Sequence, residues 1–158
     1  MSELVLRNRH PSFAANLPLL RRITRSLLTG SLAIPDFTLG VFLVDTAAMT
    51  RLNEVFLRHT GSTDVITFDH SGIGQPRALF GEIYIGLDEA RHQARRFRAT
   101  WQTELVRYLV HGVLHLCGYD DRDRRSRCRM KREEDRLVRE LARRFRLSPL
   151  ARRPRVRP

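Results

Sequence analysis

The chain has 158 residues, 42% of them hydrophobic, and its 29 Lys and Arg residues against 17 Asp and Glu residues give a formal net charge of +12. This length and composition suit one globular domain and exclude a chain that is disordered throughout. No stretch approaches the roughly 18 uncharged apolar residues of a membrane span, and the N-terminus lacks a secretion signal, so we expect a cytoplasmic protein without a membrane partner.

The hydrophobic pattern predicts alternating strands and helices over the first part of the chain. Residues 4–8 alternate weakly and predict a short strand. An apolar residue every three or four positions then predicts a helix over 13–30, although Pro18 removes a backbone donor in its first turns. β-Branched and aromatic residues predict a strand over 37–44, after which Asp45 is a candidate N-cap for a second helix.

The second part of the chain continues the mixture of strands and helices. Two strands are expected over 63–68 and 79–85, and three helices follow, over 88–97, from Thr100 to a glycine stop at Gly118, and over 123–145. The prediction is a single α+β domain over residues 1–147, with a small mixed sheet of about four strands covered by helices. Residues 148–158, rich in Pro and Arg, are expected to form a disordered basic tail.

The positive charge is concentrated at the C-terminal end. Residues 122–158 contain 16 basic and five acidic residues, whereas the first 121 residues contain 13 and 12. Most of the excess is arginine, which suits bidentate contacts with phosphate. A solvated helix face with a frayed tail would give the same composition. If the segment does bind RNA, the candidate residues are Arg122, Arg124, Arg125, Arg129 and Lys131.

Two histidines at helical spacing suggest a metal site at the end of the histidine-bearing helix. His111 and His115 are four residues apart and would project from one face of that helix. The helix then ends near Gly118, and Asp121 supplies a carboxylate that can fold back as a third ligand. Three protein ligands with an open fourth position are typical of a hydrolytic zinc site. Gly112 occupies the position of the glutamate that acts as general base in HExxH peptidases, which argues against that class.

The segment HGVLHLCGYD, residues 111–120, resembles the signature HGxLHLxGYDH of the YbeY family. These are bacterial single-domain, metal-dependent endoribonucleases of ribosomal RNA maturation and ribosome quality control. The segment TDVITF, residues 63–68, is similar to the family's TDVLSF, and Gly81-Glu82-Ile83 matches its GDI strand. Met130 and Glu134 fit the M and E of its last helix. The resemblance extends from about residue 40 to residue 138.

The resemblance implies roles for particular residues. Asp121 stands where the family has its third histidine, so it is the implied third zinc ligand, and its carboxylate makes the site more hospitable to Mn²⁺ or Mg²⁺. Arg58 matches the family's cleft arginine, whose implied role is to stabilise negative charge on the scissile phosphate.

The resemblance also implies the substrate and partners. It points to hydrolysis of phosphodiester bonds in single-stranded segments of ribosomal RNA, on the small ribosomal subunit, with a ribosomal protein or an assembly GTPase as a possible partner. Two alternatives stay open. One is a non-catalytic RNA-binding assembly factor of the same fold, and the other is a metal hydrolase that acts on another class of substrate.

Overall fold

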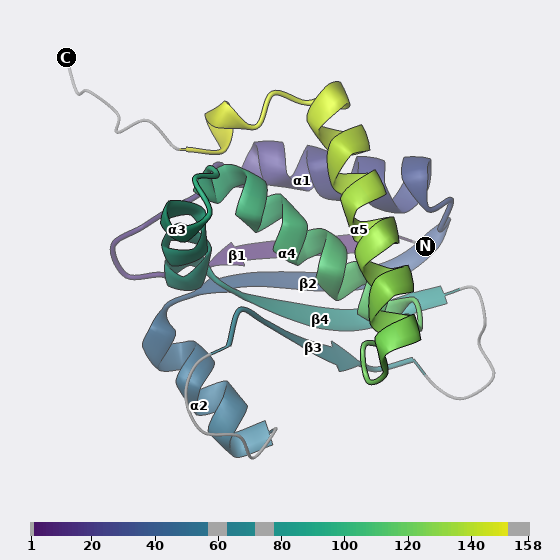
Figure 1. Cartoon of the computed structure of the whole chain (residues 1–158), viewed down its shortest axis with the longest axis horizontal. Coiled ribbons are helices and arrows are strands. Elements are labelled where there is room, and N and C mark those ends of the chain that lie inside the picture. The colour runs from purple at the N-terminus through teal and green to yellow at the C-terminus, as the bar shows by residue number, and fades with distance from the viewer. Residues whose placement is uncertain (1, 57–62, 72–77, 152–158) are drawn as a thin grey trace.

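The computed structural model describes residues 2–56, 63–71 and 78–151, and within these a four-stranded sheet is packed with helices (Figure 1). Along the chain the elements are β1 (Glu3–Asn8), α1 (Leu17–Arg25), the π-turn η1 (Ser26–Ser31), β2 (Asp36–Val44), α2 (Thr46–Phe56), β3 (Val65–Asp69), β4 (Ala78–Gly86), α3 (Leu87–Arg96), α4 (Trp101–Leu116), α5 (Arg124–Arg144) and the 3-10 turn η2 (Ser148–Leu150). The predicted α+β class is confirmed.

The sheet is mixed and has the order β1-β2-β4-β3. β1, β2 and β4 are parallel, and β3 pairs with β4 in the antiparallel direction. Buried and less buried residues alternate along β4, as expected for a strand with one face on the main core. In the register of β2 and β4, Val41 lies opposite Ile83. Both side chains are fully buried and contribute to the main core.

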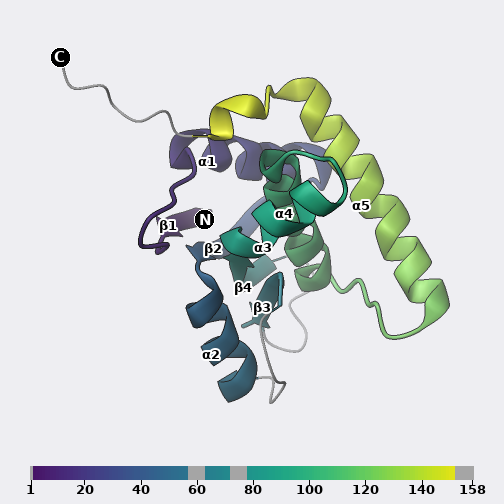
Figure 2. The ribbon, with the colours of Figure 1, turned by 60° about the vertical axis from the view of Figure 1, so that its left-hand side comes forward.

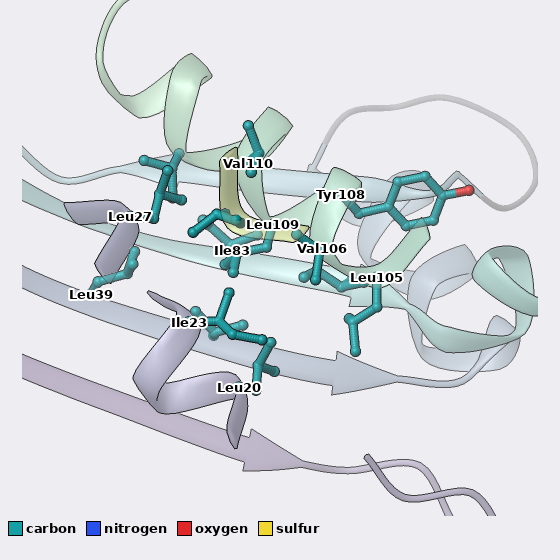
Figure 3. Packing of buried hydrophobic residues seen from close by; sticks show 14 of the residues in the cluster. Leu20, Ile23, Leu27, Leu39, Ile83, Leu105, Val106, Tyr108, Leu109 and Val110 are labelled. Carbon is teal, nitrogen blue, oxygen red and sulfur yellow. The ribbon is translucent and has the colours of Figure 1, made fainter. Parts of the chain in front are cut away.

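Helices cover the two faces of the sheet unequally. α1, α4 and α5 lie on one face and α2 lies on the other (Figures 1 and 2). Figure 3 shows the larger core, where Leu20 and Ile23 of α1 lie on one side of Ile83 of β4 and Leu105 and Leu109 of α4 lie beside it. Burial of each such side chain contributes about 1.5–3 kcal/mol. The histidine-bearing helix α4 is therefore held between the sheet and α5.

The helix expected over 13–30 begins later than predicted, whereas its end agrees, because the π-helix η1 continues α1 to Ser31. α1 begins at Leu17, because Asn16 caps it by accepting a hydrogen bond from the backbone N–H of Leu19 at 3.2 Å. Pro18 falls in the first turn, where its missing N–H would have no helical partner. The periodicity therefore placed the helix in the right region but not its first residue.

Most other helix ends agree with the predicted caps. Asp45 accepts from the N–H of Ala48 and Thr100 from that of Thr103, as predicted. Asp123 accepts from the N–H of Ser126 and caps α5, which the sequence analysis expected to begin there without naming a cap. No helix in the described part of the chain has the length and apolar composition needed to cross a membrane.

The first residues of the expected tail pack on the domain. Leu150 is fully buried, and its carbonyl accepts a hydrogen bond from the N–H of Asn16 at 2.8 Å. Ala151 forms an isolated bridge with Ala15. Residues 148–151 therefore differ from the predicted disorder, because an apolar residue between prolines finds a place beside α1. Residues 152–158 lie outside the described part.

Candidate metal centre

α4 lies very close to β4 at the level of the two histidines. A Cβ atom added to Gly112 would be 2.8 Å from Cγ2 of Ile83, so only glycine fits without a shift. His111, next to this contact, and His115, one turn later, are both only half-buried. The sequence HGxxH thus combines a helix pressed against the sheet with two imidazoles directed to one side.

The three predicted metal ligands come together. Ligand atoms of His111, His115 and Asp121 all lie within 4.8 Å of one another. The two Nε2 atoms are 3.1 Å apart, and Nε2 of His115 is 3.4 Å from Oδ2 of Asp121. Donor atoms on one tetrahedral zinc ion are about 3.3 Å apart, given bonds of about 2.0–2.1 Å. The spacing therefore fits a single ion.

The hydrogen bonds of the two imidazoles also fit a shared cation. Nδ1 of His111 is 2.9 Å from Oε1 of Glu134, and Nδ1 of His115 is 3.2 Å from the carbonyl oxygen of Tyr119. A carboxylate and a carbonyl only accept, so each Nδ1 donates. In the neutral rings the facing Nε2 atoms then hold lone pairs. Two nitrogen atoms that both hold lone pairs cannot hydrogen-bond to each other. Both can instead bind the same metal ion.

The turn after α4 positions both His115 and Asp121. Gly118 has a φ of +98°, which side chains disfavour, and it ends the helix. The N–H of Tyr119 then donates back to the carbonyl of Leu114 at 3.0 Å. This reversal brings the Tyr119 carbonyl to His115 and leads the chain to Asp121. The glycine stop that the sequence predicted is thus part of the site.

Glu134 of α5, which the sequence resemblance matched to the family's last helix without giving it a role, is the main further contributor to the site. Its side chain is 6% exposed, and besides His111 it contacts Arg107 at 2.9 Å and Lys131 at 3.2 Å. Burial raises the pKa of Glu134, but hydrogen bonds from His111 and Arg107 outweigh it and bring the pKa to about 2. The carboxylate is therefore ionised and holds the tautomer of His111. The available signal was an acid within the apolar stripe of Met130 and Leu137.

A cleft of about 550 Å³ adjoins His111 and Asp121 between α4 and α5. Its lining is rich in charged and polar groups, and burial raises the pKa of one of them, Glu104. The lining residues besides those two are Asp64, Gln93, Glu104, Arg107, Tyr108, Arg127, Met130, Lys131 and Glu134. The cleft has room for a nucleotide-sized group beside the three ligand atoms.

The other predicted site residues are distributed differently. Lys131 lines the cleft, where it pairs with Glu134 and Asp135. The remaining basic candidates are exposed and are absent from the cleft lining, namely Arg122, Arg124, Arg125 and Arg129. Arg58, the predicted catalytic arginine, lies outside the described residues.

Comparisons with known proteins agree with the sequence resemblance. The family model described as Endoribonuclease YbeY matches residues 12–142. A protein named Endoribonuclease YbeY from Chlorobium phaeobacteroides is 36% identical over 122 residues, which are 77% of this chain and 86% of that protein. A protein of the same name from Chlorobium phaeovibrioides is 43% identical over 91 residues, 58% of this chain and 60% of that one.

A solved structure supports the fold. The solution structure of a protein from Thermotoga maritima aligns over 100% of both chains with a TM-score of 0.66 and 24% sequence identity. At this identity the likeness concerns the arrangement of the elements alone.

Proposed function

The chain belongs to the YbeY family of endoribonucleases, and from that membership we propose that it hydrolyses phosphodiester bonds in single-stranded segments of ribosomal RNA. The observation that supports this most is the convergence of His111, His115 and Asp121 beside a cleft large enough for a nucleotide.

The proposed cofactor is one divalent ion held by those three side chains. Zinc is the first choice, and the carboxylate of Asp121 makes the site more tolerant of Mn²⁺ or Mg²⁺ than three histidines would be. When bound, such an ion acts as a Lewis acid and lowers the pKa of a coordinated water molecule. Glu134 and the Tyr119 carbonyl hold the two imidazoles in the tautomer that directs Nε2 to the ion.

The protein's own groups would arrange the RNA. Lys131 lies on the cleft wall, where a cation favours a phosphate. Arg58 is proposed to stabilise negative charge on the scissile phosphate, as the family resemblance implies. Four basic candidates lie outside the cleft and would contact the RNA backbone at a distance from the reacting bond. They are Arg122, Arg124, Arg125 and Arg129.

We further propose a role in maturation of the small ribosomal subunit, in the cytoplasm, with a ribosomal protein or an assembly GTPase as a partner. These proposals rest on the family alone. Co-purification of the tagged chain with ribosomal particles, analysed for its RNA and protein content, tests them.

The activity is tested by His115→Ala. Purified wild type is expected to cut a single-stranded RNA when supplied with Zn²⁺, Mn²⁺ or Mg²⁺, and His115→Ala is expected to lose cleavage at least 100-fold while RNA binding is retained. His92→Ala, which changes an exposed histidine on α3, is the matched control. If folded wild type cuts no RNA with any of these ions and His115→Ala changes nothing, the non-catalytic RNA-binding factor is the better account.

A further inference from the structure

The outer side of α5 presents a row of arginines. Six of them recur at alternating spacings of four and three residues, so they lie along one side of the helix. The buried residues of α5, among them Met130, Leu137 and Leu141, lie on the opposite side. This outer arginine row consists of Arg125, Arg129, Arg132, Arg136, Arg139 and Arg143. It extends over about 27 Å at a rise of about 1.5 Å per residue.

The acidic residues of α5 do not neutralise the positive charge of the outer arginine row. Arg136 pairs with Glu133 and Glu140, and Glu140 also pairs with Arg144. The other two acids within α5, Glu134 and Asp135, are engaged with Arg107 and Lys131 on the cleft side.

The row therefore carries unbalanced positive charge. Within the described part of the chain, the guanidinium groups of its five members other than Arg136 form no hydrogen bond or ion pair, and all five residues are exposed. Like charges three and four residues apart destabilise a helix. A polyanion on this face would remove that repulsion.

The chemistry of the row favours the phosphates of a nucleic acid duplex. Arginine forks bind phosphate oxygens in pairs. The row has no aromatic side chain, so it lacks the aromatic platforms on which single-strand binders stack successive bases. The apolar side of α5 is buried in the domain, which excludes its insertion into a membrane. The bases of a duplex are stacked inside and its phosphates face outwards. A row that consists only of arginines can therefore bind it through the phosphates.

The position of the row links it to the cleft. α5 lies along one edge of the molecule in Figure 2, and in Figure 1 it passes in front of the strands. Arg127 and Lys131 of its first turns line the cleft, on the other side of the same helix from Arg125 and Arg129. A helix with its side chains is about 10–12 Å across. An RNA strand that leaves a duplex on the outer row could therefore reach the cleft within a few nucleotides.

We propose that the outer arginine row docks the backbone of an RNA duplex that adjoins the single-stranded segment in the cleft. The inference rests on the proposed function for the nature of the polyanion, but its test is independent of cleavage.

The test compares two triple variants that lose the same charge. Arg132→Gln, Arg139→Gln and Arg143→Gln are combined in the row variant, and Arg25→Gln, Arg51→Gln and Arg95→Gln, exposed residues of α1, α2 and α3, in the control variant. Glutamine keeps high helix propensity, and circular dichroism verifies the fold. Binding to a blunt RNA hairpin and to an unstructured RNA of equal length is measured by fluorescence anisotropy at several salt concentrations, with the probes verified intact on a gel.

The row variant is expected to lose about 0.9 units of slope in log K against log salt for each phosphate contact, about 2.7 for three contacts. This loss is expected with the hairpin, and the control variant is expected to keep the wild-type slope. An unchanged hairpin slope in the row variant overturns the inference. An equal loss of slope in the row and control variants also overturns it, because that result would indicate an effect of net charge alone. An equal loss of slope with the hairpin and with the unstructured RNA overturns it as well. Wild type that binds the hairpin through the row but cuts no RNA would refute the proposed function and leave this inference standing.

Discussion

Asp121 gives this site a different charge from one with three histidines. Its carboxylate oxygen lies 3.4 Å from Nε2 of His115, and its side chain is 48% exposed. A carboxylate ligand lowers the net charge of a bound divalent ion, which weakens the polarisation of a coordinated water and suits harder ions. At the residue scale, Asp121 therefore makes the electrostatics of this cluster different from those of three histidines.

The contact between Glu134 and His111 leads to a prediction about metal affinity. In Glu134→Gln an amide donor replaces one carboxylate oxygen, so the residue can no longer serve both His111 and Arg107 as an acceptor. We expect zinc affinity to fall about 10–100-fold, because such partners orient the ligand ring. Competition with a chromophoric chelator measures it.

Glu133→Gln is the matched control for that experiment. Glu133 is the neighbouring acid on α5, and its side chain pairs with Arg136 on the outer side. The control is expected to bind zinc as wild type does. Equal affinities for Glu134→Gln and Glu133→Gln would show that the buried carboxylate does not support the ligand.

At the scale of elements, the site depends on how closely α4 lies against β4. Gly112 permits that approach, and the turn at Gly118 returns the chain to the histidines. α5 then closes the other side with Glu134. β4, α4 with its following turn, and α5 thus meet at one end of α4.

Gly112→Ala is expected to disturb this packing. The new methyl group would lie 2.8 Å from Cγ2 of Ile83, a fully buried side chain with no free direction to move. Overpacking costs about 1–3 kcal/mol and the better helix propensity of alanine returns about 1 kcal/mol. We expect a net loss of up to about 2 kcal/mol in urea unfolding, together with weaker zinc binding. Stability equal to or above that of wild type would show that α4 can move away from β4 without cost.

The sequence predicted the local parts of this arrangement better than the tertiary ones. The pair His111 and His115, the stop at Gly118 and the cap at Asp45 follow from helical spacing and capping chemistry, and the structure agrees with each. The role of Glu134 depends on α5 crossing α4, which periodicity does not specify. The start of α1 was misplaced because apolar spacing continues through the loop that precedes Asn16.

At the scale of the whole molecule, the C-terminal end consists of a positively charged helix followed by a short segment that packs on the domain. Residues up to Leu147 include α5 and its outer arginine row, and residues 148–151 return to pack beside α1. Leu150 is fully buried there. The folded domain therefore includes residues that the charge pattern alone assigned to the tail.

Two truncations separate these contributions. Removal of residues 152–158 keeps the buried Leu150 and its hydrogen bond with Asn16, so we expect the thermal unfolding midpoint to stay unchanged. Removal of 148–158 also deletes the buried Leu150 and its hydrogen bond with Asn16, and we expect a loss of about 2–5 kcal/mol. Differential scanning calorimetry measures both. Because both truncations remove the same four arginines, equal stability of the two chains would contradict a structural role for Leu150.

Elemental analysis of the purified protein tests the central claim most directly, namely that His111, His115 and Asp121 hold one divalent ion. Wild type, His111→Ala and Asp121→His are compared by mass spectrometry of the metals after gel filtration, with circular dichroism to verify each fold. We expect one divalent ion per folded wild-type chain, its loss from His111→Ala, and a larger share of zinc in Asp121→His. A folded wild type without a stoichiometric ion, or with an ion that His111→Ala retains, would contradict it.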